Sequence, residues 1–424
     1  MHYLRKDTTF WPQSFHFYEK NCTFDALSIQ PSIMKRNMLT LLLLALSPLL
    51  ACADDNDSLP EQGHYVHMVR AEAATGAILH TNEYLKGGNE EGRTMNHSFV
   101  AKLKYAFMKP QNTVEAHIYK GAYQGIGVAW HEFNPQLSNP VSAFIFQGAR
   151  IATLASRLSL NYEWNLGVTC GWKPYDKLTN PDNKVIGSRV TAFINTDFYL
   201  NWQISREFDL NAGISLTHFS NGNTKIPNSG LNVAGAKVEL AYYFNRDKQP
   251  QESDKPIPVF NRHMSYDLVF YGAWKRMGFY GNEGPTSVPG SFAVAGFNFN
   301  PMYNINHWLN AGLSLDGVYD HSANIRYHEL RHETRYPKTI KQMALGLSAR
   351  AEFVMPYFTI NLGAGHHFIN ARGHLNGWYQ ILALKLNLTR RTFLHIGYSL
   401  NELKNPNNLM LGFGIRFNNQ RRSL

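Results

Sequence analysis

A histidine and a serine stand two residues apart in the segment His218-Phe219-Ser220-Asn221. On a β-strand, residues two apart point to the same face, so the imidazole and the hydroxyl would lie side by side. An imidazole in that position can accept the serine proton as a general base, which activates the oxygen for attack on an ester carbonyl. The pair therefore predicts nucleophilic ester chemistry, with Ser220 as the attacking group and His218 as the base.

The residues before this pair indicate which face it occupies. From Phe208 to Leu216 the even-numbered residues are apolar, and the odd-numbered residues between them are Asp, Asn, Gly and Ser. His218 and Ser220 continue the apolar face. Asn232 opens the next alternating segment, again on its apolar face. An imidazole, a hydroxyl and an amide are thus predicted to converge on the apolar side of one end of a hairpin.

The elements that must position these groups are strands, because the same period-two alternation recurs along the chain. The clearest segments are 99–107, 158–168, 208–216, 382–388 and 394–400. Such segments approach the length of about 9 to 11 residues that a tilted membrane strand needs. A soluble β-sandwich also alternates, but the export signal, the strand lengths and the aromatic content described below favour a transmembrane antiparallel β-barrel.

The alternating segments fall into two groups that resemble each other. About eight lie in residues 64–245 and about eight more in residues 263–417, and the polar, proline-containing stretch 246–262 between them reads as a linker. Leu210 to Leu216, followed by a Pro-Asn loop, parallels Leu394 to Leu400, followed by another Pro-Asn loop. We expect an all-β chain of two tandem eight-stranded barrels. One barrel of about sixteen strands is the alternative.

Composition narrows the class of protein. Aromatic residues make up 13% of the chain, with 22 Tyr and 26 Phe, which suits the aromatic girdles of membrane barrels. The mean hydropathy is −0.33, and after the N-terminal region no apolar run reaches the roughly 18 to 20 residues of a spanning helix. The net charge of +10 indicates either attraction to an anionic surface or simply an excess of solvated Lys and Arg side chains. The basic residues form no continuous run, so we expect no nucleic-acid partner.

A secretory signal is predicted at residues 34–53. Lys35 and Arg36 precede an apolar stretch that ends in Ala51-Cys52-Ala53, the order that a cleaved signal peptide needs. We expect Met34 to be the start of translation, residues 1–33 to be an upstream extension, and cleavage to follow Ala53. A lipoprotein box at Cys52 is the alternative.

The segment from His218 to Asn232 resembles the lipid A 3-O-deacylases of the PagL type, a family of acyloxyacyl hydrolases that are eight-stranded outer-membrane barrels. The resemblance implies a Gram-negative outer-membrane esterase that removes an acyl chain from the lipid A part of lipopolysaccharide, without a metal or other cofactor. It also implies that Asn221 and Asn228 help to bind the oxyanion. The third catalytic residue of that family is a Glu, and this chain has Asn232 at the corresponding position.

Topology agrees with that resemblance. If the chain starts in the periplasm, the seventh strand runs outward and residues 221–229 form an external loop, close to the lipopolysaccharide of the outer leaflet.

The final strand ends with Phe417, which resembles the C-terminal signal that barrel-assembly machinery recognises, although seven further residues follow it here. In the second group of strands, Glu402 and Lys404 stand where His218 and Ser220 would be, so we expect a degenerate barrel without a triad.

Two other sequence features are not expected to form a functional site or a disulfide. The sequence from His328 to His332 fits the zinc motif HExxH, but it lies in a charged connection without an apolar helical stripe, so no metal site is expected. Once Cys22 and Cys52 are removed with the leader, Cys170 has no disulfide partner. The alternative to an esterase is a catalytically weak or inactive barrel with a structural or pore-forming role.

Overall fold

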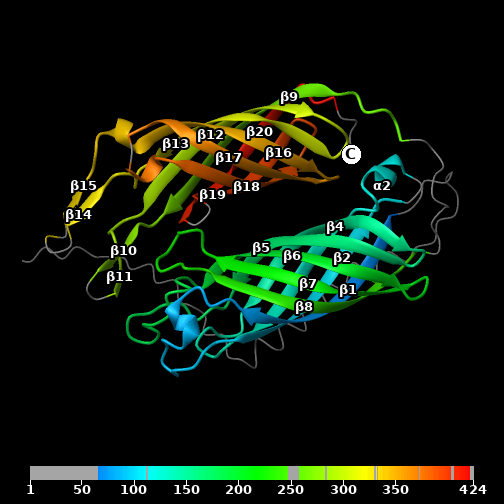
Figure 1. The fold of residues 1–424 in the computed structure, drawn as a ribbon, viewed down its shortest axis with the longest axis horizontal. Coiled ribbons are helices and arrows are strands. Elements are labelled where there is room, and N and C mark those ends of the chain that lie inside the picture. The colour runs from blue at the N-terminus through cyan, green and yellow to red at the C-terminus, as the bar shows by residue number, and fades with distance from the viewer. Residues whose placement is uncertain are drawn as a thin grey trace, which may run out of the picture. The chain divides into compact units, whose positions relative to one another are not determined.

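The structure is a computed structural model that describes residues 65–110, 113–246, 257–281, 284–328, 331, 333–371, 373–402 and 405–420. It is all-β, and its main sheets close into two antiparallel barrels of eight strands each (Figure 1). The prediction of two eight-stranded barrels is confirmed, and the alternative of one barrel of about sixteen strands is wrong. The expected leader (residues 1–53) and residues 247–256 of the expected linker lie outside the described residues.

The first barrel is an uninterrupted meander, because each strand pairs with the next along the chain. It closes where the first strand pairs with the eighth over Met68–Ile78 and Val233–Tyr243. Its strands are β1 (Val66–Ile78), β2 (His97–Met108), β3 (Tyr123–Glu132), β4 (Val141–Ala155), β5 (Leu158–Cys170), β6 (Val190–Gln203), β7 (Phe208–Ser220) and β8 (Leu231–Tyr243).

The second barrel has the same meander order and closes between its first and last strands. Two short hairpins, β10 (Gly278–Gly281) with β11 (Gly284–Ser287) and β14 (Arg326–His328) with β15 (Glu333–Arg335), extend two of its connections. Its barrel strands are β9 (His263–Lys275), β12 (Phe292–Asn304), β13 (Leu309–Asp320), β16 (Met343–Val354), β17 (Phe358–Asn370), β18 (Trp378–Asn387), β19 (Thr392–Asn401) and β20 (Asn405–Phe417).

Helical turns are short and few in the described part of the chain. They are η1 (Glu83–Lys86), α2 (Val114–Ile118), η3 (Thr339–Gln342) and η4 (Gly373–Leu375). Among the described residues, we find no helix with the length and apolar character to cross a membrane.

The alternation in the sequence separates the inside of each barrel from its outside. On β2, Lys102 and Lys104 are buried in the lumen, whereas Phe99 and Ala101 on the other face are exposed. On β7, Ile214 and Leu216 are 57% and 50% exposed. Exposed apolar side chains on the outer wall and buried polar ones inside are the reverse of a soluble barrel, and they are typical of strands that cross a bilayer.

Charged side chains of opposite sign fill the lumen of the first barrel. Lys104 Nζ lies 2.8 Å from Glu72 and 2.7 Å from Glu163, and it also pairs with Glu239. Arg70 bridges Glu163 and Glu239. The other members of this network are Lys102, Asp197 and Lys237. Burial of a charge is tolerated only when it is paired, so the network acts as a polar core.

The second barrel has a separate network of the same kind. Lys385 pairs with Asp267 and Glu352, and Arg416 pairs with the same two carboxylates. Arg350 pairs with Asp316. Each lumen is therefore occupied by side chains that neutralise one another, as expected for a barrel of eight strands.

An aromatic cluster fills the first lumen at the end where β7 terminates. Phe219 is fully buried and packs edge-on against Trp172, with ring centres 5.1 Å apart. It also contacts Phe193 and the ring of His131. These rings anchor the C-terminal end of β7 from inside the barrel.

The two ends of the first barrel differ in their connections. The end where β7 terminates carries the loops 79–96, 133–140, 171–189 and 221–230. At the opposite end, the turns 156–157 and 204–207 are tight, and the connection 109–122, which contains α2, is longer. Transmembrane barrels generally have short turns on the periplasmic side and longer loops outside. The two tight turns therefore favour the external end for residues 221–230.

The buried network predicts an unequal response to lysine substitution. Lys104→Met removes the cation shared by three buried carboxylates, and we expect a loss of about 3 to 5 kcal/mol of unfolding free energy. Lys86→Met removes an exposed ion pair with Glu83 and should change little. Urea unfolding in lipid vesicles, followed by circular dichroism, measures both. Equal unfolding midpoints would contradict a stabilising role for the lumen charges.

Candidate active site

The external end of β7 carries the predicted pair on the outer wall. His218 and Ser220 follow Ile214 and Leu216 on the exposed face, while Phe219 between them points into the lumen. The side-chain period of a strand thus brings the imidazole and the hydroxyl to the same side, with their Cα atoms about 7 Å apart. Both residues lie at the end of the apolar outer face of β7, where His218 is half-buried and Ser220 is buried.

The imidazole is held by the neighbouring strand. His218 on β7 is directly opposite Asn232 on β8, and His218 Nδ1 lies 2.7 Å from Asn232 Oδ1. An amide oxygen only accepts hydrogen bonds, so Nδ1 carries the proton and Nε2 is left with a free lone pair. This is the tautomer that a general base on the Nε2 side requires.

Two donors converge on the serine. Ser220 is 9% exposed, and its Oγ accepts a hydrogen bond from the backbone N–H of Gly222 at 3.1 Å and from Asn228 Nδ2 at 3.2 Å. The Ser220 proton is not used in either bond, so it can pass to a base. Donors beside a nucleophilic oxygen can also stabilise negative charge that develops on a bound carbonyl oxygen.

Asn221 and Asn228 have different positions in the site. Asn228 Nδ2 contacts Ser220, while the backbone N–H of Asn221 donates to Asn228 Oδ1 at 3.0 Å. The side chain of Asn221 turns away and donates to the carbonyl of Lys225 at 2.8 Å. Asn228 therefore faces the Ser220 hydroxyl, and Asn221 orients Asn228.

Two glycines in the same loop were not singled out in the sequence. Gly222 and Gly230 have φ angles of +62° and +74°, the left-handed region that other residues avoid. A Cβ on Gly230 would lie 2.9 Å from His218 Cε1, so this glycine lets the backbone pass against the imidazole. The Asn-Gly and Ser-Gly dipeptides are the signal in the sequence that could have indicated both turns.

Other candidate chemistry is not supported by the described residues. Glu72, Glu163 and Glu239 lie close enough to hold a metal, but lysine and arginine side chains neutralise them. His328 ends the strand β14 and pairs with Glu333, so it is not on a helix as the HExxH motif requires; Glu329, Leu330 and His332 of that motif lie outside the described residues.

The second barrel offers no matching pair where the sequence alignment places one. Glu402 follows the end of β19, and Lys404 lies outside the described residues. Neither residue type can repeat the serine and histidine chemistry. The candidate site belongs to the first barrel.

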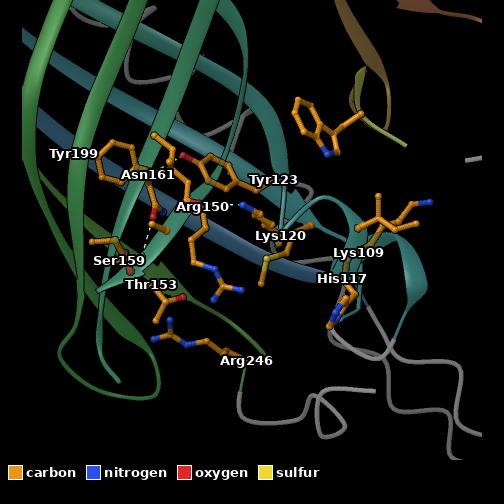
Figure 2. Close-up of a pocket in the computed structure, with 18 of the residues that line it drawn as sticks. Lys109, His117, Lys120, Tyr123, Arg150, Thr153, Ser159, Asn161, Tyr199 and Arg246 are labelled. Carbon is orange, nitrogen blue, oxygen red and sulfur yellow. Dashed lines mark hydrogen bonds between the residues drawn. The ribbon is translucent and has the colours of Figure 1, made fainter. Parts of the chain in front are cut away.

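The opposite mouth of the first barrel holds a basic pocket (Figure 2). Lys109, Lys120 and Arg150 line it, and Ser159 Oγ donates to Asn161 at 2.8 Å. His117, the labelled histidine, lies apart from Ser159 in Figure 2.

Both halves of the chain match known families. Residues 104–241 match the family described as lipid A 3-O-deacylase (PagL), and residues 264–419 match the acyloxyacyl hydrolase C-terminal domain. The first match includes β7 and most of β8, and therefore every residue of the candidate site. A comparison with curated proteins found no match.

Solved structures give weaker likenesses. The crystal structure of the outer membrane enzyme PagL shares 13% sequence identity, with a TM-score of 0.28, over 40% of this chain and 97% of that chain. A porin variant from Rh. blastica shares 6% identity over 84% and 100%, and Omp33 of Acinetobacter baumannii shares 8% over 83% and 98%, both with TM-scores of 0.16. Scores this low carry no inference about function.

The geometry predicts selective reactivity of Ser220. A fluorophosphonate should form a covalent adduct at Ser220, because the oxygen attacks phosphorus, fluoride leaves and the base takes the proton. His218→Ala should slow the reaction about 100-fold or more. Exposed Ser229, in the same loop, is the internal control for unassisted serine. Mass spectrometry of the digested protein locates the adduct, and equal labelling of both serines would contradict activation of Ser220.

Proposed function

Since the chain belongs to the PagL family of outer-membrane lipid A 3-O-deacylases, we propose that it hydrolyses an ester-linked acyl chain of lipid A with Ser220 as nucleophile and His218 as base. By family resemblance the ester is the one at the 3-O position. The observation that carries the mechanism is the placement of both side chains on the outer wall, with the His218 ring fixed by Asn232. A substrate embedded in the outer leaflet meets the site from the side.

The reaction follows from the donors and acceptors around Ser220. His218 Nε2 takes the hydroxyl proton as Ser220 Oγ bonds to the acyl carbon. The carbonyl oxygen gains negative charge near Asn228 Nδ2 and the N–H of Gly222. The protonated imidazole then gives its proton to the departing sugar oxygen. Water, activated by the same base, hydrolyses the acyl-enzyme and releases the fatty acid.

The amide of Asn232 accounts for part of what a carboxylate would do. It holds the ring by Nδ1 in the productive tautomer, as the asparagine does in Cys-His-Asn proteases. It carries no charge, so it stabilises the imidazolium less than a glutamate would. We therefore expect a working site with a lower turnover than a glutamate would support.

A passive pore has less support. The described lumens hold buried ion pairs and, in the first barrel, an aromatic cluster, and an eight-stranded barrel is narrow enough for side chains to fill. The second barrel, without a serine and histidine pair at the corresponding place, suits a structural or lipid-contacting role.

Substitution of the nucleophile tests the proposal directly. Purified Ser220→Ala should release fatty acid from lipopolysaccharide at a rate at least about 1000-fold below wild type, because no alternative nucleophile is positioned. Ser229→Ala, in the same loop, should keep wild-type activity. Mass spectrometry quantifies the released fatty acid. Equal release by wild type and Ser220→Ala, or none by either, would reject the proposed mechanism.

A gain of activity is expected from restoring the charge. Asn232→Glu places a carboxylate at the imidazole, and the stronger charged hydrogen bond should raise kcat by about 10-fold, or about 1.4 kcal/mol. Asn232→Gln has the same length without the charge and is the matched control. If the two variants turn over at the same rate, the missing charge does not limit this enzyme.

A further inference from the structure

The long external loop between β5 and β6, residues 171–189, folds against the loop that carries the site. At its centre, Asn183 is completely buried, although asparagine is usually a surface residue. A buried amide must be hydrogen-bonded, and its partners indicate what it holds in place.

The Asn183 side chain fixes the backbone of Val185 and Ile186. Asn183 Oδ1 accepts from the N–H groups of Val185 at 3.1 Å and Ile186 at 3.0 Å, and Asn183 Nδ2 donates to the carbonyl of Lys173 at 3.0 Å. Val185 and Ile186 are also completely buried, in the apolar cluster that contains Phe219. The turn at residues 183–186 is thus rigidly attached to the core.

That turn holds the segment on which the site depends. The N–H of Ser229 donates to the carbonyl of Lys184, and the N–H of Gly230 donates to the carbonyl of Val185, both at 3.2 Å. Two consecutive backbone bonds fix the position and the direction of residues 229–230. A third contact is tight: a Cβ on Gly187 would lie 2.1 Å from the carbonyl oxygen of Pro227.

The segment 227–232 carries three groups that act on the pair. Asn228 donates to Ser220, Gly230 lies against the ring of His218, and Asn232 accepts from His218 Nδ1. Strand pairing fixes Asn232 directly, since it is on β8. Asn228 and Gly230 precede the strand, so their positions depend on the loop that supports them.

We propose that Asn183 is a positioning residue for the deacylation reaction, holding Gly230 against the His218 ring and Asn228 on Ser220 through the turn at 184–187. This rests on the proposed function of the Ser220 and His218 pair. Asn183 does not touch the pair, and it acts through the backbone bonds from Ser229 and Gly230. A displacement of about 1 Å in a catalytic group can cost about 100-fold in rate.

The loop also contains a matched control. Asn180 is 4% exposed, and its side chain donates to the carbonyls of Gln136, Lys173 and Pro174. Like Asn183, it makes three side-chain hydrogen bonds to the backbone of external loops. Unlike Asn183, it makes none of them to the turn at 184–187 that meets residues 229–230.

The experiment compares Asn183→Ala with Asn180→Ala in the full-length protein. We expect Asn183→Ala to lower kcat about 10- to 100-fold with KM within about twofold of wild type, because acyl-chain binding on the outer wall is unchanged. Asn180→Ala should keep kcat within about twofold. Thermal unfolding of both variants in vesicles reports any loss of stability, and a merely structural role would lower the two kcat values alike.

A conservative variant adds a second measurement. Asn183→Asp keeps the acceptors for the N–H groups of Val185 and Ile186, but it loses the donor to Lys173 and buries a carboxylate. It should therefore recover part of the lost kcat and lower the unfolding temperature. A wild-type kcat for Asn183→Ala, or similar losses in Asn183→Ala and Asn180→Ala, would overturn the proposal. The proposed function fails separately, if Ser220→Ala is as active as wild type.

Discussion

The requirement that every backbone donor and acceptor be paired inside a bilayer determines the rest of this molecule. A sheet meets that requirement only when its first strand pairs with its last, as β1 does with β8 and β9 with β20. Closure then divides each strand into an inner and an outer face with a period of two. The site uses this division, because His218 and Ser220 continue the outer face of β7 while Phe219 anchors the strand inside.

Strands and loops contribute different parts of the site. Strand pairing places the imidazole opposite its orienting amide, which needs no information beyond the register of β7 and β8. The loops add what a strand cannot supply, namely donors that point back at Ser220 and a backbone without a Cβ beside the imidazole. The chemistry that we propose thus depends on the paired strands β7 and β8 and on the loops 171–189 and 221–230. The packing of these two loops decides how well the donors are aligned with Ser220.

The sequence predicted the parts of the structure that depend on local periodicity. Alternation alone indicated the strands, the two groups of eight and the outward face of His218 and Ser220. It did not separate the roles of Asn221 and Asn228, because both are polar loop residues and their hydrogen bonds depend on the path of the loop. The role of Asn183 could not be predicted either, because the turn that it holds contacts residues 229–230 in a loop that is distant in sequence. The family resemblance pointed to the chemistry that we propose, and the tertiary contacts pointed to the loop residues that would support it.

The lumen charges have a consequence for how such a chain could arise. Among the described residues, the ion pairs of the two lumen networks each lie within one barrel: Arg70, Lys102, Lys104 and Lys237 balance Glu72, Glu163, Asp197 and Glu239, while Arg350, Lys385 and Arg416 balance Asp267, Asp316 and Glu352. A gene segment that encodes one whole barrel therefore carries its own counter-ions. Duplication of such a segment would leave no unpaired lumen charge in either copy, so residues on the outer wall of one copy could change without unbalancing the charges of the other.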